Sequence, residues 1–239
     1  MAVTKIFIFF NNQKTGANSM SIRPLITHRL GLQFSRNIYL HKGPRVSGLK
    51  KHPELVFITK EGIKHEPSPK NLQYIKAFLE DKYQIPDDMI LQVLTHKSFG
   101  NGIKPYNEKL SAMGSKIVNL FFAKYCIEGN NNNNENSING KNLDVLGSPI
   151  AKELGGRLSL GIFAKTYKLN SIMFWNSYNY DLNFESSGEL KVSAQMMYAL
   201  IGAVNFIHGK AVSEQFIRQK LIDMKPSVED ITKTIIEQQ

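Results

Sequence analysis

Apolar residues recur at helical spacing along most of the chain after residue 67. Leu72, Ile75 and Leu79 fall on one side of a predicted helix that ends near residue 83. Ser68 and Pro69 precede this stripe, and they form a favourable helix start, with a capping hydroxyl followed by proline at the first helical position. The pattern therefore predicts that the folded part of the chain begins with a helix at residue 69.

Two further helices are predicted by the same periodicity. The segment PDDMILQVLTH opens at Pro86 with acidic residues in its first turn, where negative charge suits the helix dipole. A longer helix is predicted from about Asn107 to Tyr125. Its expected apolar face is Leu110, Met113, Ile117, Leu120 and Phe121.

The pattern breaks at an Asn-rich loop over residues 129–142, because asparagine competes for the backbone hydrogen bonds of a helix. Helices resume in LDVLGSPIAKEL and GIFAKTY, and an aromatic segment around Trp175 is expected to close over the core. ELKVSAQMMYALIGAVNFIHG is apolar on nearly all sides, which is typical of a buried central helix that ends at Gly209. One more helix follows, and without βαβ alternation the predicted class is all-α.

Composition permits one sizeable core, since 239 residues can hold a domain of about 150 residues with extensions. No uninterrupted apolar run reaches the roughly 20 residues that span a bilayer. The single cysteine, Cys126, cannot form an internal disulfide and matches no metal-ligand spacing. We expect it to be a small buried residue on a helix.

The net charge of +10 is concentrated at the N-terminus. Nine of the 30 basic residues and none of the 20 acidic ones precede Glu54, so the remainder carries 21 basic and 20 acidic side chains. Arg23, Arg29 and Arg36 lie between apolar and hydroxyl residues, which predicts a mitochondrial presequence over residues 1–39. A basic tail of a nuclear or cytosolic protein is the alternative, and Met20 is a second candidate start.

Residues 40–67 are predicted to form an extended basic arm, because glycine and proline interrupt any long helix there. The cations of its first part, before Glu54, have no acid among them, and they are candidates for contact with an RNA phosphate backbone. A solvated linker is the equal alternative. The candidate RNA-binding residues are Lys42, Arg45, Lys50 and Lys51.

Three motifs in order resemble the ribonuclease III catalytic domain over roughly residues 68–223: LTHKSF, NEKLSAMGSKIVNLF and KVSAQMMYALIGAVNFIHG. The family has a Thr-His-Lys/Arg-Ser-aromatic segment, a signature helix of the type NERLEFLGDAVL and a later helix of the type ADTVEALIGAVYLD. The positions that match the two helices are Asn107, Glu108, Leu110, Gly114, Ala194, Ala199, Leu200, Ile201, Gly202, Ala203 and Val204. The resemblance implies an all-α ribonuclease III-like domain over residues 68–225, with an extended N-terminal arm.

Enzymes of that family cleave double-stranded RNA with divalent metal ions held by carboxylates, because hard ions need charged oxygen ligands. The five corresponding positions are Glu108, Ser111, Ser115, Gln195 and Tyr198, so four of the five are neutral. We therefore expect no catalysis, no bound metal and no cofactor. His96 and Ser98 lack a triad partner in the sequence, and we expect them to bond locally and shape the turn after the second helix.

The chain keeps the packing positions of the family but not its acidic residues, so the resemblance implies a scaffold that contacts partners. The family often carries a double-stranded-RNA-binding domain, but the residues after Asp223 are too few for one, and 226–239 are expected to be a tail. Family members dimerise through the signature helix, so Ala112, Met113 and Gly114 are candidate partner contacts, although Met113 is equally an ordinary core residue.

A presequence, an inactive domain and a basic arm together resemble the ribonuclease-III-like structural proteins of the fungal mitochondrial large ribosomal subunit. The resemblance implies contact with the rRNA of that subunit and a heterodimer with a second ribonuclease-III-like protein, without a membrane or a small-molecule substrate. Two alternatives stay open: a non-catalytic partner of an active mitochondrial RNA-processing nuclease, and an active nuclease with relocated metal ligands.

Overall fold

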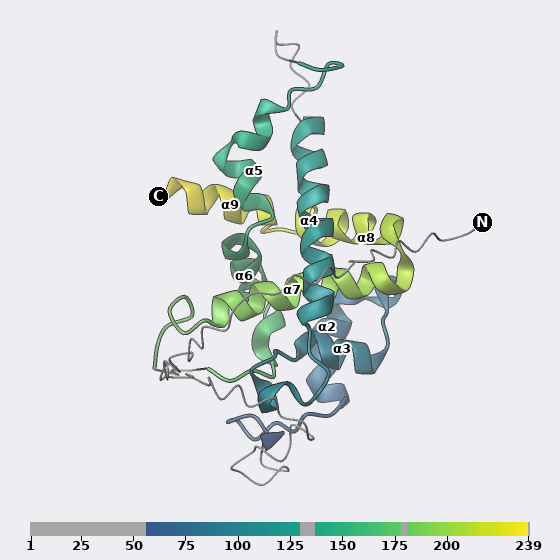
Figure 1. The fold of residues 1–239 in the computed structure, drawn as a ribbon, viewed down its shortest axis with the longest axis vertical. Coiled ribbons are helices and arrows are strands. Elements are labelled where there is room, and N and C mark those ends of the chain that lie inside the picture. Colours follow the sequence, from purple (N-terminus) through teal and green to yellow (C-terminus); the bar gives the residue numbers. More distant parts are fainter. Residues whose placement is uncertain (1–55, 130–136, 178–180, 239) are drawn as a thin grey trace, which may run out of the picture. The chain divides into compact units, whose positions relative to one another are not determined.

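The computed structural model describes residues 56–129, 137–177 and 181–238 (Figure 1). Every named element in these ranges is a helix, and the extended pairings among them are isolated bridges such as the one between Ile58 and Lys64. The all-α prediction is therefore confirmed. The predicted presequence, most of the basic arm and part of the Asn-rich loop lie outside the described residues, as do Lys42, Arg45, Lys50 and Lys51.

The α-helices follow one another as the periodicity predicts over most of the domain. Their bounds are α2 Pro69–Leu79, α3 Asp87–Leu94, α4 Glu108–Gly129, α5 Pro149–Leu154, α6 Arg157–Thr166, α7 Glu189–His208, α8 Lys210–Ile217 and α9 Val228–Glu237. Short 3-10 turns are η2 Asp81–Tyr83, η3 Phe99–Gly102, η4 Asp144–Gly147 and η5 Leu169–Ser171, and η6 Arg218–Ile222 is a π-helical turn.

The predicted start and stop signals are observed. The Ser68 hydroxyl accepts a hydrogen bond from the backbone N–H of Asn71, and Pro69 is the first residue of α2. Gly209 ends α7 with a φ of 82°, in the left-handed region that glycine adopts without strain. The helix predicted from Asn107 to Tyr125 begins one residue later and runs on to Gly129, with Cys126 buried as expected.

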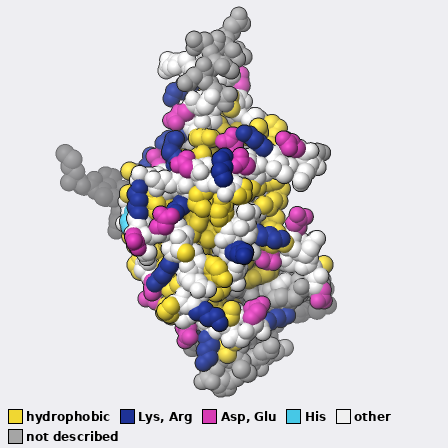
Figure 2. Space-filling model, turned by 180° about the vertical axis from the view of Figure 1, so that it is seen from behind, with side chains coloured by type: hydrophobic (Ala, Val, Ile, Leu, Met, Phe, Trp, Pro, Cys, Tyr) yellow, Lys and Arg dark blue, Asp and Glu magenta, His cyan; other side chains and the backbone are white. Residues whose placement is uncertain are grey.

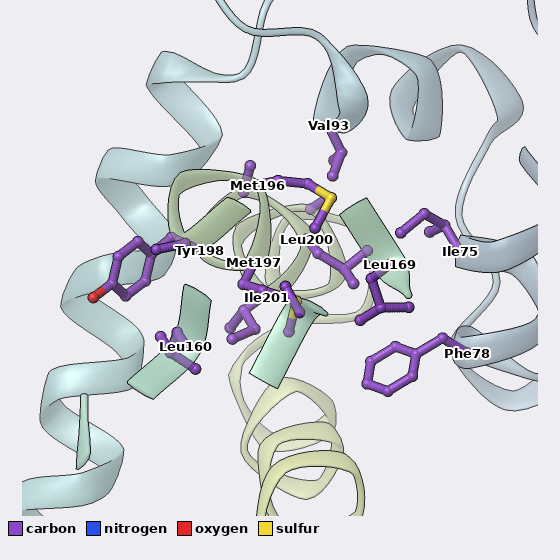
Figure 3. Packing of buried hydrophobic residues seen from close by; sticks show 14 of the residues in the cluster. Ile75, Phe78, Val93, Leu160, Leu169, Met196, Met197, Tyr198, Leu200 and Ile201 are labelled. Atoms are coloured by element: carbon purple, nitrogen blue, oxygen red, sulfur yellow. The ribbon is translucent and has the colours of Figure 1, made fainter. Parts of the chain in front are cut away.

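Helix α7 is the centre of the core, and α3, α4, α6 and α8 all pack against it. It is long and apolar enough to cross a membrane, but most of its hydrophobic stretch is buried inside the domain, so packing accounts for its composition. Met196, Met197, Leu200 and Ile201 project from α7 into the cluster formed with residues of α2, α3 and α6 (Figure 3). The prediction of a buried central helix is confirmed.

Helix α4 crosses α7 with backbone against backbone (Figure 1). A Cβ atom on Gly114 would lie 1.8 Å from the carbonyl oxygen of Tyr198, and one on Gly202 would lie 2.2 Å from the carbonyl oxygen of Leu110. This contact decides which face of α4 is buried, and the predicted face is partly wrong. The buried residues are Leu110, Gly114, Val118, Phe121, Phe122 and Cys126, whereas Leu120 is 49% exposed.

Both ends of the domain extend beyond the predicted limits. Among residues 226–239, which were expected to be a tail, α9 packs against α5 and α6. A capping box between Ser227 and Asp230 fixes its start, and its apolar face is buried. At the other end, residues 56–67 belong to the fold, since Phe57 and Ile63 pack against the core. The His65 ring packs against the rings of Phe99 and Phe174, which also contact each other.

Surface charges are mixed. On the face opposite to that drawn in Figure 1, acidic and basic side chains are interspersed around a central group of hydrophobic ones (Figure 2). This distribution agrees with the near balance of charge after residue 53. Any strong attraction between the domain and a polyanion therefore needs a local cluster of cations.

Candidate functional site

The five positions singled out by the resemblance line one pocket, which has a volume of about 580 Å³. The wall from α4 contributes Glu108, Ser111 and Ser115, and the wall from α7 contributes Gln195 and Tyr198. The remaining lining residues are Ala112, Asn119, Lys152, Gly155, Gly156, Arg157 and Lys191. The structure therefore brings the predicted site together.

Glu108 is the single carboxylate among the five, and it lies at the start of α4. Its carboxylate oxygen is 3.3 Å from Nζ of Lys97, and both side chains are more than half exposed. The hydroxyl of Ser115 donates a hydrogen bond of 3.0 Å to the carbonyl oxygen of Ala112 on its own helix. The α4 wall thus offers one carboxylate that already has a cationic partner and hydroxyl groups without charge.

On α7, the two neutral residues hold the fold together. The Gln195 amide donates a hydrogen bond of 3.0 Å to the side-chain oxygen of Asn107, whose own amide donates to the carbonyl of Val93. The Tyr198 hydroxyl donates a hydrogen bond of 2.6 Å to the carbonyl oxygen of Gly155. Gln195 therefore connects α7 to the segment before α4, and Tyr198 connects it to the turn between α5 and α6.

Tyr198 also fills space beside the pocket. Its side chain is 8% exposed, and burial raises the pKa of its phenol above the ordinary value. In Figure 3 the ring projects away from the other labelled side chains of α7, with its hydroxyl at the tip. A phenol that stays protonated supplies no negative charge for a metal ion here.

The three basic residues of the pocket were not among the site residues predicted from the sequence. Lys152 lies on α5, Arg157 begins α6, and Lys191 lies on α7 one turn before Gln195. None of these three forms an ion pair with any residue in the described ranges. Lysines and arginines are common on helix surfaces, so only their convergence in space distinguishes this trio.

The donor set does not fit the metal ions that the resemblance implies. One carboxylate, two hydroxyls, two amides and a buried phenol line the pocket together with three cations, whereas magnesium needs several oxygen ligands with negative charge. Within the described ranges, no group of three or more His, Cys, Asp and Glu side chains is placed to hold a metal ion.

The predicted partner contacts occupy two environments. Ala112 is exposed, and Met113 is half-buried, with its sulfur 3.9 Å from the side-chain nitrogen of Asn205. Gly114 is buried at the crossing of α4 and α7, which corrects its expected place on a surface. The reason is steric, because the two helices approach so closely there that no side chain fits.

His96 and Ser98 bond locally, as predicted. The His96 Nδ1 atom lies 2.9 Å from the Ser98 hydroxyl, and that hydroxyl accepts a hydrogen bond from the backbone N–H of Asn176. Burial lowers the pKa of His96, although the nearby Glu108 acts in the opposite direction. The pair joins the turn after α3 to the segment that contains Trp175.

Comparison with known proteins places the fold. A family model described as ribonuclease-III-like matches residues 86–225. The large ribosomal subunit protein mL57 of Neurospora crassa is 24% identical over 141 residues, covering 54% of this chain and 52% of that protein. Ribonuclease 3 of Bdellovibrio bacteriovorus is 22% identical over 143 residues, covering 59% and 56%. The chain spans about half the length of the curated relatives it matches.

A solved structure shares the architecture. The nuclease domain of ribonuclease III from Campylobacter jejuni superposes with a TM-score of 0.50 at 18% identity. The match covers 65% of this chain and 99% of that domain. The helical arrangement described above is therefore that of a ribonuclease III nuclease domain, and the fold expected from the sequence is confirmed.

Proposed function

Because this chain belongs to the ribonuclease-III-like family, we propose that it is a non-catalytic structural component of the mitochondrial large ribosomal subunit. In this proposal the domain is a scaffold that binds rRNA and pairs with a second ribonuclease-III-like protein. It uses no metal, no cofactor and no small-molecule substrate, and it does not contact a membrane.

The neutral residues of the pocket carry this proposal. Gln195 and Tyr198 occupy positions that the enzymes fill with acids, and both form hydrogen bonds that join separate parts of the fold. Ser111 and Ser115 cannot supply the negative charge that offsets the dehydration of a divalent ion. Neutral residues at the acidic positions, two of them with structural partners, are suited to holding shape and not to metal-dependent hydrolysis.

The two curated relatives have different functions and are nearly equally identical to this chain, so we choose between these functions from the residues of the site. One is named as a large ribosomal subunit protein and the other as a ribonuclease. Hydrolysis by metal ions depends on the acidic ligands, whereas a structural role depends on the packing positions. This chain keeps Gly114 and Gly202 at the helix crossing but lacks four of the five acids, which favours the ribosomal role.

Sedimentation tests the proposal directly. A tagged full-length protein, expressed in mitochondria, should sediment with intact ribosomes and with the large subunit on a sucrose gradient. When EDTA dissociates the ribosomes, the protein should move to the large-subunit fraction and not to that of the small subunit. A protein that stays near the top of the gradient with RNA-processing activity would instead support the alternative, a non-catalytic partner of a mitochondrial processing nuclease.

Mitochondrial import is part of the same proposal. The run before Glu54 contains nine basic residues and no acid, a composition typical of a matrix-targeting segment. Residues 1–40 fused to a fluorescent reporter should carry it into mitochondria. A variant with Arg23, Arg29 and Arg36 changed to glutamine is the matched control, and it should remain in the cytosol. Cytosolic fluorescence from the unaltered fusion would contradict the targeting role.

The basic arm is proposed to hold the protein on rRNA, since the remainder of the chain is nearly neutral. Glutamine at Lys42, Arg45, Lys50 and Lys51 should allow release from large subunits at lower potassium chloride concentration, because fewer phosphates are neutralised. The control variant carries glutamine at four exposed positions of the domain away from α4: Lys64, Lys70, Lys165 and Lys168. Release of both variants and the parent at the same salt concentration would make the arm a linker.

The exposed stripe of α4 is proposed to contact the second ribonuclease-III-like protein. Ala112 is exposed, and Met113, Ile117 and Leu120 continue along the helix with partial or substantial exposure. Ala112→Arg places a charge on this stripe without entering the core, so pull-down of the partner should weaken while the domain stays folded by circular dichroism. Lys124→Ala, near the far end of α4, is the control. Unchanged pull-down by Ala112→Arg would contradict this interface.

A further inference from the structure

The pocket between α4, α7 and the α5–α6 turn has an excess of positive charge. Lys152, Arg157 and Lys191 line it from three different helices, and all three are exposed to solvent within it. Each approaches from its own element, so the fold, not a local run of charge in the sequence, gathers them.

The acids near the pocket offset this charge only in part. Glu108 is paired with Lys97, and Glu153 has its carboxylate next to Gly156 in the α5–α6 turn. Four cations therefore face two carboxylates in and around the pocket. Since no described residue forms an ion pair with the three lining cations, their positive charge is available to a ligand.

We propose that this pocket binds a phosphate group of an RNA backbone directly, through Lys152, Arg157 and Lys191 and without a metal ion. The proposal rests on the proposed function, because it identifies how the scaffold would hold rRNA. An enzyme of this fold needs acids here to hold ions between itself and its phosphate. In this chain the pocket is positively charged instead of negatively charged, so a phosphate can bind to it without a metal ion in between.

The neutral residues are consistent with such a ligand. A carboxylate at Ser111 or Ser115 would face the phosphate and repel it, whereas a hydroxyl is uncharged. The Ser115 hydroxyl already donates to the Ala112 carbonyl, but the Ser111 hydroxyl can donate a hydrogen bond to the phosphate. Asn119 adds an amide donor farther along the same wall. The replacement of acids by serine therefore removes repulsion as well as metal binding.

The lining favours RNA over an acidic protein segment. Apart from Ala112 and the ring of Tyr198, the lining residues are charged, polar or glycine, so little apolar surface is available to pack against the aliphatic part of a peptide. A volume of about 580 Å³ also exceeds what one carboxylate would fill, and it accommodates a phosphate with its adjoining riboses. Ligands that are polar throughout are bound best by such a surface.

A salt titration of RNA binding tests the proposal. The probe is a fluorescently labelled double-stranded RNA oligonucleotide, and its anisotropy is measured with the full chain in EDTA across a potassium chloride series. The parent should bind in EDTA. The triple variant Lys152→Gln, Arg157→Gln, Lys191→Gln should bind about ten-fold more weakly, because charge-assisted hydrogen bonds are lost. Its slope of log K against log salt should be smaller by about 0.9 for each phosphate no longer neutralised.

The matched control is the triple variant Lys64→Gln, Lys70→Gln, Lys116→Gln, which removes the same charge from exposed positions outside the pocket. Its affinity for the RNA should be closer to that of the parent than the affinity of the pocket variant is. Both variants should show unchanged circular dichroism. Equal losses in the two triple variants would reduce the effect to net charge and overturn the proposal.

Three other results would also overturn it: a pocket variant with the affinity and slope of the parent, binding by the parent that requires magnesium, and a pocket variant that binds RNA normally but loses a protein partner. The last would assign the pocket to an acidic protein. Failure here is distinguishable from failure of the ribosomal assignment, because sedimentation of the parent with the large subunit does not depend on the pocket variant.

Discussion

The hydroxyl of Tyr198 lies 2.6 Å from the carbonyl oxygen of Gly155 and donates a hydrogen bond to it. Tyr198 comes from the middle of α7, and Gly155 comes from the turn between α5 and α6. Both residues are buried, so neither the hydroxyl nor the carbonyl can exchange this bond for water without cost. A position that serves chemistry in the enzymes of this family thus joins two parts of the fold here.

Removal of that hydroxyl should destabilise the domain. Tyr198→Phe leaves the Gly155 carbonyl without its partner, and we expect the free energy of unfolding to fall by about 1 to 3 kcal/mol in a urea titration. Tyr74→Phe is the control, because the Tyr74 side chain is 37% exposed. Its effect should stay within about 0.5 kcal/mol. Equal stability of Tyr198→Phe and the parent would show that the bond contributes nothing.

Gly114 should tolerate no side chain. A Cβ atom there would lie 1.8 Å from the Tyr198 carbonyl oxygen, so α4 and α7 would have to separate along their contact. Gly114→Ala should therefore lower the free energy of unfolding by about 3 kcal/mol or more, measured by thermal or urea unfolding. Gly129→Ala, at the end of the same helix with open space around it, should change it by about 0.5 kcal/mol or less. Similar results for both glycines would refute the close crossing.

Features that depend on local sequence were predictable. The hydroxyl of Ser68, the position of Pro69 and the glycine at 209 define helix ends through interactions within a few residues, and all were placed correctly. The buried character of α7 was also readable, since its residues are apolar on every side. The five site positions came from the resemblance, and in the structure they line one pocket.

Features that depend on contact between distant segments could not be predicted from the sequence. The buried face of α4 is set by the approach of Gly114 to α7, a relationship that apolar periodicity cannot express, because glycine does not count as apolar. The helix α9 was taken for a tail, although its capping box was present in the sequence. Lys152, Arg157 and Lys191 are separated by up to 39 positions in the numbering, and only the tertiary fold brings them to one pocket.

The domain should lose stability as the solution is acidified below pH 6.5. Burial, assisted by the charge of Lys104, lowers the pKa of His65 from 6.5 to about 4. Its Nε2 atom is 2.8 Å from the Thr95 hydroxyl oxygen, which itself donates to the Leu91 carbonyl, so the neutral ring donates to Thr95. Protonation would add a charge beside two phenylalanine rings.

The direction of this pH dependence follows from the number of protons bound by the folded and the unfolded protein. Between pH 6.5 and about 4 the unfolded chain binds a proton at His65 that the native protein does not, so the free energy of unfolding falls as pH falls through this window. The depressed pKa of His96 acts in the same direction. Because part of the His65 ring is accessible to solvent, we expect a loss of about 1 kcal/mol from it.

Urea titrations at several pH values, with and without His65→Gln, measure this contribution. The variant should show a shallower decline between pH 6.5 and 4, and NMR titration of the parent should place the His65 midpoint well below 6.5. A midpoint near 6.5, or a parent whose stability increases on acidification, would contradict the buried neutral state.

Magnesium should neither stabilise the protein nor activate it. A ligand that binds the native state raises the thermal unfolding temperature once its concentration exceeds its dissociation constant, and this pocket offers one paired carboxylate and three cations to a divalent ion. The unfolding temperature should therefore be the same in EDTA and in millimolar magnesium chloride, with ionic strength matched by potassium chloride. An increase in magnesium that disappears in Glu108→Ala would show a functioning metal site.

Cleavage assays complete the argument, because a weakly bound ion can still support turnover. Double-stranded RNA incubated with the purified protein should remain intact with magnesium or manganese, while an active ribonuclease III in parallel degrades it. Four of the five acidic positions are neutral, so no arrangement of Glu108 alone can hold the ions and activate water. Glu108→Ala separates the protein from a contaminant. Metal-dependent cleavage lost in that variant would make the chain an enzyme, whereas cleavage retained in it would come from another nuclease in the preparation.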